Sequence, residues 1–444
     1  MSTGPASTRK SLLRHPLSQL VLAACLAFSM VFFVTRILIP YQVSDATLHR
    51  RPRGNLSDLY PRWLGARELW LHGRNPYSQE VKLEIQSGYY GRPLDPSNPA
   101  DPGDQQGFAY PVYVTFLLIP TLRLPFETVR IGFTWLLVAL TAASVFCWLR
   151  MLRWTPGWAA TAAVLLLTLG SFAGLQGVKL QQLSLVVAAL LSASAALLVG
   201  GHLFAAGVIL AIATIKPQLV ALLAAFLTYW SVIEWETRRN FLFGFAMTLA
   251  LLCLGAHWLL PGWIGYFWHA LHEYQRYTGG QSRLDVLLGP VVGKGASALL
   301  VIGLAAVSYR LAKAPSNPRT LSLAFSTMLA ATLVVMPNFA PYNEVLLLPA
   351  VLVVAREALD PAQSRGFRLA AAAAGFFLAW GWIAALGLTL ASCFAPAATV
   401  QRAWAAPLWT EFAIAPSMLL TLGLLLVRQI KTPLGEEPRP IDYR

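Results

Sequence analysis

Residues 57–77 read SDLYPRWLGARELWLHGRNPY and follow the first long apolar run of the chain. The apolar residues in this stretch recur at steps of three and four: Leu59, Trp63, Ala66 and Trp70. This spacing places them on one face of a helix, and the arginines fall elsewhere. A helix with tryptophan and leucine on one side and arginine on another is typical of the headgroup layer of a membrane. The stretch therefore predicts a short amphipathic helix on a membrane surface.

Asp58 stands at the start of this predicted helix. Aspartate is a preferred N-cap residue, and Pro61 is tolerated in the first turn, so capping alone accounts for the pattern. Three features also favour a catalytic carboxylate. Asp58 lies just outside a membrane span, Arg62 and Arg67 are close in sequence, and the later polar residues of the membrane part are few and clustered. One aspartate can serve both roles.

The composition is that of an all-α integral membrane protein. Of the 444 residues 56% are hydrophobic and only 12% are charged, whereas a soluble chain would be about a quarter charged. Apolar runs recur from Leu20 to Val427. The net charge of +14 is typical of cytoplasmic loops near anionic headgroups, and we find no motif for nucleic acid.

The four cysteines are far apart and lie in or beside apolar runs: Cys25, Cys147, Cys253 and Cys393. They predict small buried side chains, with no zinc spacing and no disulfide framework. The first apolar run is too long for a removable signal peptide and is expected to be an anchor. No cofactor is expected.

The sequence predicts one polytopic membrane domain over residues 1–444, with roughly eleven to thirteen helices. Residues 1–17 are expected to be a basic cytoplasmic tail. Residues 42–109 would form the first extracytoplasmic loop, with the interfacial helix inside it. Residues 261–288 would form a second polar loop, and residues 429–444 a polar C-terminal tail.

Twelve apolar segments are the candidate spans. They lie near residues 18–41, 110–125, 130–152, 157–175, 180–199, 203–233, 240–260, 290–312, 320–336, 341–356, 366–390 and 405–428. At about 1.5 Å per residue the segment 110–125 is short for a bilayer core of about 30 Å, which leaves the topology up to residue 180 open.

A few polar residues interrupt the apolar runs. Lys216 precedes Pro217 in the middle of a span, where the proline should break the helix. An ionisable group at such a depth favours function, although a lysine near a helix break can also extend to the membrane surface. Lys179, Gln181 and Gln182 lie between two spans and fit a connecting turn equally well.

Aromatic residues recur at helical spacing in the second polar loop and predict a second interfacial helix. His269 and His272 are three residues apart in it, but no third ligand has a suitable spacing, so no metal site is expected. Gln281 and Arg283 follow in a polar segment. A third polar island, residues 337–344, fits either a turn or part of a site.

Seven short motifs come in a fixed order: Asp58, Gly73, Asn75-Pro76-Tyr77, Tyr110-Pro111, Gln182-Leu183-Ser184, Lys216-Pro217 and Gln281-Ser282. Their order and spacing resemble glycosyltransferase family 87 of the GT-C superfamily. The best-known members resemble the polyprenol-phosphate-mannose-dependent mannosyltransferase of phosphatidylinositol mannoside synthesis. The resemblance covers roughly residues 20–360.

The resemblance implies a GT-C-like helix bundle, a lipid-phosphate-sugar donor and a catalytic aspartate in the first extracytoplasmic loop, which is Asp58 in this chain. The glutamine motif maps to Gln182. Two positions depart from the family pattern: Gln181 replaces the usual glycine, and Val112 replaces a frequent second proline.

The chemistry of such a donor agrees with these residues. Asp58 would be the general base for an acceptor hydroxyl. The leaving phosphate is stable as an anion, so it needs cations and no general acid. Direct displacement with one base inverts the anomeric carbon. The expected substrate-binding residues are Arg62, Trp63, Tyr110, Gln182, Lys216, His272, Arg276, Gln281, Arg283 and Tyr342.

The expected function is a hexosyltransferase of the plasma (inner) membrane, with mannose as the expected sugar. Its partners would be a polyprenyl-phosphate-sugar donor, a lipid or glycan acceptor and membrane lipids, and its active site would face the extracytoplasmic side. Two alternatives stay open. A transporter or flippase also uses broken helices, although we find no inverted repeat, and a scaffold could retain the motifs without activity.

Overall fold

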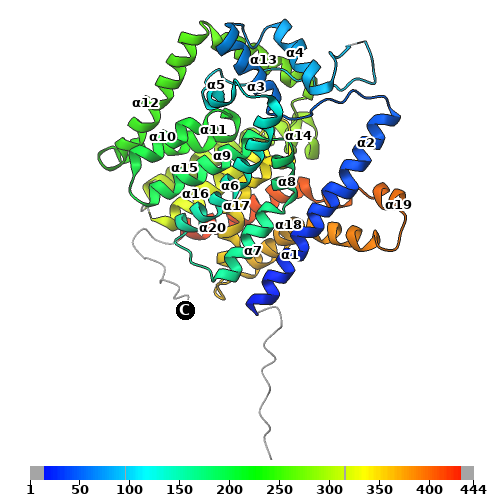
Figure 1. Cartoon of the computed structure of the whole chain (residues 1–444). Coiled ribbons are helices and arrows are strands. Elements are labelled where there is room, and N and C mark those ends of the chain that lie inside the picture. Colours follow the sequence, from blue (N-terminus) through cyan, green and yellow to red (C-terminus); the bar gives the residue numbers. More distant parts are fainter. Residues whose placement is uncertain (1–14, 96, 315–316, 432–444) are drawn as a thin grey trace, which may run out of the picture.

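The computed structural model describes residues 15–95, 97–314 and 317–431, and helices are the only regular elements in those ranges (Figure 1). This confirms the predicted all-α fold. Most of the expected N-terminal tail and nearly all of the C-terminal tail, residues 1–14 and 432–444, lie outside the described residues.

Seven helical segments of the described residues are long and apolar enough to cross a membrane. They are Pro16–Leu48 (α1 Pro16–Phe32, η2 Phe33–Leu38 and α2 Ile39–Leu48), α6 Phe126–Met151, α12 Trp235–Leu259, α15 Pro290–Lys313, α16 Pro318–Val335, α18 Arg365–Ala391 and Ala397–Gln429. The last segment contains α19 Ala397–Arg402, η5 Ala406–Leu408 and most of α20 Glu411–Lys431.

Several of the expected spans are helices shorter than these seven long segments. The pair α7 Trp158–Leu169 and α8 Phe172–Lys179 is bent by 52° and could make an eighth crossing. The short apolar helices are α9 Leu183–Val199, α10 Leu203–Ala213 and α11 Pro217–Ile233. Because hydropathy does not distinguish a short apolar helix inside the bundle from a full crossing, the expected number of roughly eleven to thirteen exceeds the number of long spans.

The break at Lys216 is confirmed: α10 ends before it and α11 begins directly after it. The expected segments 110–125 and 341–356 are also interrupted. The first contains only α5 Val114–Leu118 and η3 Ile119–Thr121, and the second contains η4 Pro341–Leu347 and α17 Leu348–Ala358.

Helix α16 is enclosed by the bundle, with 83% of its apolar window buried, whereas α12 and α18 have only 11% buried. Helix α12 lies at one edge of the molecule (Figure 1). Helices α10 and α12 approach each other closely at two glycines. A Cβ atom on Gly207 would lie 2.1 Å from the Phe241 carbonyl oxygen, and one on Gly244 would lie 2.2 Å from that of Phe204. Small residues that allow such backbone approach are typical of membrane helix pairs.

A layer of short helices lies over one end of the bundle, at the top of Figure 1. It contains α3 Tyr60–His72, α4 Gln79–Tyr90 and α13 Trp263–Thr278, and α14 Arg283–Leu288 follows beside it. Most of α3 is buried by protein, in the same apolar core as α4 and α6. The predicted helix therefore forms, but it is enclosed by protein and does not lie open on a membrane surface.

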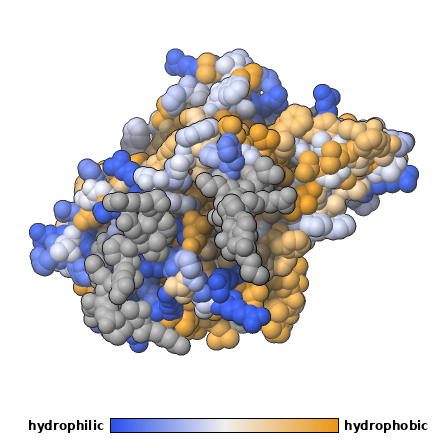
Figure 2. Space-filling view, turned by 90° about the horizontal axis from the view of Figure 1, so that it is seen from below, coloured by the Kyte–Doolittle hydropathy of each residue, from blue (hydrophilic) through white to orange (hydrophobic). Residues whose placement is uncertain are grey.

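Arginines join the helix ends at the opposite end of the bundle. Arg356 donates a hydrogen bond to the Leu152 carbonyl oxygen at 2.6 Å, and Arg319 forms an ion pair with Glu357 at 2.9 Å. Figure 2, which views the molecule from below, shows hydrophilic patches flanked by apolar surface. Arginine-rich helix ends away from the covering layer agree with the positive-inside rule.

Candidate active site

Asp58 lies two residues before the start of α3, but its side chain does not cap the helix. The N-cap residue is Leu59, which has no side-chain capping bond. The Asp58 carboxylate instead accepts a hydrogen bond from the Tyr89 hydroxyl at 3.1 Å and another from the Gln182 amide nitrogen. Capping therefore does not explain this aspartate, and its carboxylate belongs to a polar cluster between the covering layer and the bundle.

The turn between α8 and α9 holds the Asp58 segment in place. The Asp58 amide donates to the Leu180 carbonyl oxygen at 2.9 Å, and the Ser57 hydroxyl donates to Gln181 Oε1 at 2.7 Å. Gln181 has a positive φ of 50°, a backbone conformation that glycine adopts more readily. This conformation explains why a glycine suits the position. In this chain the hydrogen bond between the Gln181 side chain and Ser57 offsets part of the backbone strain.

Lys216 lies at the break between α10 and α11, and its side chain is buried. Its Nζ donates to Gln182 Oε1 at 3.0 Å and to the Ser184 hydroxyl at 2.7 Å. The Ser184 hydroxyl donates in turn to Asn343 Oδ1 at 2.6 Å. One chain of hydrogen bonds therefore runs from Asp58 through Gln182 and Lys216 to the element that carries Tyr342.

A second cation, Arg62, lies near the same tyrosine as Lys216. The Arg62 guanidinium lies 4.3 Å from the Tyr110 ring centroid, and Lys216 Nζ lies 5.9 Å from it and 5.3 Å from that of Tyr342. Arg62 Nη1 donates to the Asp58 carbonyl oxygen at 2.5 Å. Its buried Nε has no hydrogen-bond partner among the described residues, so this donor is available to an anionic ligand.

Aromatic and acidic groups also surround Asp58. Burial raises the pKa of Tyr89 above its ordinary value, and the Asp58 carboxylate raises it further, so the hydroxyl remains a donor. The neighbouring Tyr90 ring lies edge-on at 4.7 Å, and its hydroxyl donates to the Asp104 carbonyl oxygen at 2.6 Å. Burial also raises the pKa of Asp104. Tyr274 of α13 lies within the electrostatic reach of both carboxylates.

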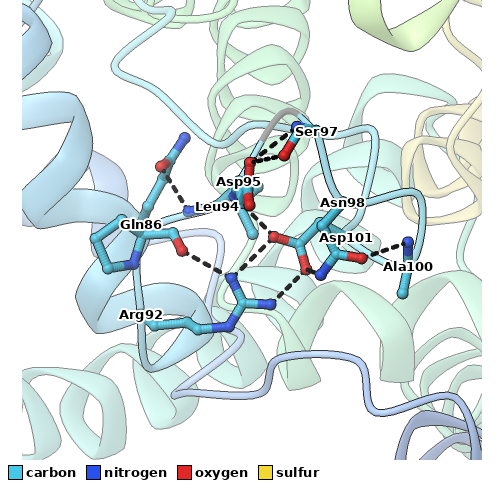
Figure 3. A network of polar contacts seen from close by, with 9 residues as sticks. Gln86, Arg92, Leu94, Asp95, Ser97, Asn98, Ala100 and Asp101 are labelled. Carbon is cyan, nitrogen blue, oxygen red and sulfur yellow. Dashed lines mark hydrogen bonds and ion pairs between the residues drawn. The ribbon is translucent and has the colours of Figure 1, made fainter.

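The loop that carries Asp104 is held by a polar network (Figure 3). Arg92 forms two contacts with the Asp101 carboxylate, at 2.5 and 2.9 Å. The amide of Asp95 donates to the same carboxylate at 2.8 Å, and Gln86 accepts from the backbone of the loop at 3.1 Å. Because these bonds fix the loop against α4, Asp104 has a defined position beside Tyr90.

The structure brings together six of the residues that the sequence indicated, and it places the others elsewhere. The six are Asp58, Arg62, Tyr110, Gln182, Lys216 and Tyr342.

Trp63 is buried against Phe126 and donates to the Thr121 carbonyl oxygen at 3.3 Å, so it packs in the core. The other predicted residues belong to the region around α13. The side chains of Arg276 and Gln281 are exposed there. His272 is also exposed and binds the Trp268 carbonyl oxygen at 2.8 Å. These three make no hydrogen bond to the cluster in the described part of the chain.

Arg283 is fully buried and forms an ion pair with Glu344, with its guanidinium 4.2 Å from the Phe339 ring centroid. It contacts the cluster only indirectly, because Glu344 lies two residues after Tyr342. Its Nε and Nη1 atoms have no partner among the described residues. The arginine thus anchors the short helix η4.

Sequence reasoning missed Tyr89, Tyr90 and Asp104, which lie in a helix end and an irregular loop without a recognisable motif. It also missed Ser184 and Asn343 as a pair, although both belong to polar motifs that the sequence displays. The described ranges contain no group of three or more His, Cys, Asp or Glu side chains that could hold a metal ion.

The comparison with known families identifies the family of this chain. The model of glycosyltransferase family 87 matches residues 108–337, more than half of the chain. The match contains Tyr110, Gln182 and Lys216, and Asp58 precedes it. No curated protein and no solved structure matches the chain. A glycosyltransferase family model favours an enzyme over the transporter alternative. The chain is a polytopic membrane hexosyltransferase and belongs to glycosyltransferase family 87.

Proposed function

We propose that this enzyme transfers a hexose, with mannose as the expected sugar, from a polyprenyl-phosphate donor to a hydroxyl of a lipid or glycan acceptor. The observation that supports this most strongly is the position of the Asp58 carboxylate. It accepts hydrogen bonds from Gln182 and Tyr89, and the cations Arg62 and Lys216 and the carboxylate of Asp104 lie within its electrostatic reach. The site thus has groups suited to a phosphate and groups suited to a neutral sugar.

The cationic side suits the donor phosphate. Arg62 and Lys216 lie against the ring of Tyr110, and two cations so close together repel each other until an anion lies between them. The orphan Nε of Arg62 offers a buried donor for that anion. Charge-assisted hydrogen bonds of this kind stabilise the negative charge that grows on the phosphate as the bond to the sugar breaks.

The aromatic and acidic groups suit the acceptor. A carboxylate such as Asp104 repels phosphate but accepts hydrogen bonds from sugar hydroxyls. The rings of Tyr89 and Tyr90 add flat apolar surface, which suits the faces of a sugar. The acceptor hydroxyl would approach Asp58 along these groups, while the donor phosphate lies against the two cations.

The reaction is then a single displacement. Asp58 takes the proton of the acceptor hydroxyl as its oxygen forms a bond to the anomeric carbon. The bond from that carbon to the phosphate oxygen breaks, and the phosphate leaves with the electron pair. The anomeric configuration inverts because the acceptor attacks opposite to the leaving group. Asp58 returns its proton to water after the product has left.

An extracytoplasmic orientation of the site is supported by the arginine-rich helix ends on the far side of the bundle. Donor lipids with the tail in the bilayer would present their phosphate at the level of the covering layer.

The test is sugar transfer by the purified protein in lipid nanodiscs, with a panel of polyprenyl-phosphate sugars that includes mannose. We expect one polyprenyl phosphate to be released for each sugar transferred, and the new glycosidic bond to have the inverted configuration. Transfer without release of polyprenyl phosphate, or with retained configuration, would contradict the proposed reaction.

A further inference from the structure

Gln182 contacts both charged partners of the site with opposite ends of one amide. Its Nε2 donates to Asp58 Oδ2, and its Oε1 accepts from Lys216 Nζ at 3.0 Å. The reverse orientation would place the carbonyl oxygen against the carboxylate and the NH2 group against the ammonium, which repels at both ends. The charges on either side therefore fix the direction of the amide.

We propose that Gln182 is a positioning residue that separates the Asp58 carboxylate from the Lys216 ammonium and prevents the two from forming a direct ion pair. The inference rests on the proposed function, since it assigns the two charges to different steps of one reaction. A direct pair would cover the oxygen that must accept the hydroxyl proton. It would also draw the ammonium away from the donor phosphate.

The surroundings show that the separation is built into the fold. The backbone of Asp58 is held by the carbonyl of Leu180, in the same turn that carries Gln182. Lys216 is held from its far side by the Ser184 hydroxyl at 2.7 Å. Gln182 is buried at the N-terminus of α9, so water does not easily replace it between the two charges.

Other groups also act on the Asp58 carboxylate from the elements around it. Those within its electrostatic reach, besides Lys216 and the hydrogen-bonded Tyr89, are Arg62, Tyr90, Asp104, Tyr110, Tyr274 and Tyr342. A change at position 182 leaves all of these in place, so its effect can be compared with the wild type.

Two substitutions distinguish a spacer from a simple hydrogen-bond donor. Gln182→Met keeps a side chain of similar length between the charges and removes both hydrogen bonds. Gln182→Ala removes the bonds and also opens the gap, so that Lys216 can reach Asp58. The double variant Gln182→Ala/Lys216→Met opens the gap but leaves no ammonium to enter it.

The first readout is the dependence of kcat on pH, whose acid limb reports protonation of the base. In Gln182→Ala we expect the limb to move to lower pH by about one unit, because an opposite charge favours the carboxylate. In Gln182→Met and in the double variant we expect it to move to higher pH, because the hydrogen bond to the carboxylate is lost. Movement in the same direction in both single variants would overturn the proposal.

The second readout needs no transfer. Equilibrium binding of polyprenyl phosphate to the protein in nanodiscs should weaken at least about tenfold in Gln182→Ala, since a charge-assisted contact to the phosphate is lost. Binding should stay within about threefold of wild type in Gln182→Met, where Ser184 still holds Lys216. Equal losses in both variants would overturn the spacer role, even if the wild type transferred no sugar and the proposed function had failed.

Discussion

Replacing Lys216 by methionine tests the cationic side of the site. The substitution keeps the length and apolar stem of the side chain and removes the ammonium. In the folded protein this ammonium makes two hydrogen bonds, to Gln182 at 3.0 Å and to Ser184 at 2.7 Å, and it lies near the rings of Tyr110 and Tyr342.

The effect on the transition state should exceed the effect on stability. Loss of a preorganised group that stabilises developing charge costs about 2.7–4 kcal/mol, which lowers kcat about 10²- to 10³-fold. The lost hydrogen bonds are partly offset because a buried ammonium no longer has to be desolvated. We therefore expect the Tm of Lys216→Met to stay within a few degrees of wild type.

The assay is transfer in nanodiscs at saturating donor and acceptor, with Tm measured on the same preparations. Lys179→Met is the matched control, because Lys179 ends the neighbouring helix α8 and its side chain donates to Gln42 Oε1 at 3.1 Å, outside the cluster. The control should retain kcat within about threefold. A Lys216→Met enzyme with kcat as high as that of the control would refute the assignment of Lys216 to the leaving phosphate.

Three further predictions concern the scaffold of the site. Arg283→Met should destabilise the protein by about 3–5 kcal/mol, because it leaves Glu344 buried without its partner; Arg283→Met/Glu344→Gln should recover most of the loss in thermal unfolding, and no recovery would count against the pair. Burial raises the pKa of Asp104, so the folded protein favours its protonated form. The free energy of unfolding therefore falls as the pH rises from the ordinary pKa of an aspartate through the raised pKa of Asp104. Asp104→Asn should therefore be more stable than wild type at pH 8 by Tm, with the difference shrinking toward pH 4, and a pH-independent difference would contradict this. Gly207→Leu should prevent folding or lower Tm sharply, because its Cβ would meet the Phe241 carbonyl oxygen at 2.1 Å; an unchanged Tm would show that α10 and α12 do not pack as described.

The sequence predicts those features that depend on local pattern. Long apolar runs predict helices, and the proline after Lys216 predicts the break between α10 and α11, since a proline removes a helix hydrogen bond. The ordered motifs also indicate Asp58 and Gln182, which the structure places in direct contact. The family they resemble is confirmed by the matching family model.

Other features depend on which surface covers a helix, and local pattern does not determine that. Tryptophan and leucine on one face of α3 suit a membrane surface and a protein core equally well, and Trp63 packs in the core. The same ambiguity applies to α13, where His272 and Arg276 are exposed.

Contacts between distant segments are also hidden in the sequence. Tyr89 and Asp58 are 31 residues apart, and Gln182 and Asp58 are 124 apart. No sequence motif predicts the first pair, because tyrosines are common at helix ends and do not indicate a contact with a distant aspartate. The second was suggested only by the resemblance, and its geometry depends on the turn between α8 and α9.

The most direct test of the account is the transfer activity of Asp58→Asn. This change keeps the shape of the side chain and removes the base, so transfer should fall by about 10²- to 10⁴-fold. Asp45→Asn is the matched control, because Asp45 lies earlier in the chain and pairs with Arg51 at 2.7 Å. We expect wild-type transfer in the control and loss of transfer in Asp58→Asn. Full transfer by Asp58→Asn would contradict the central claim that this carboxylate is the base.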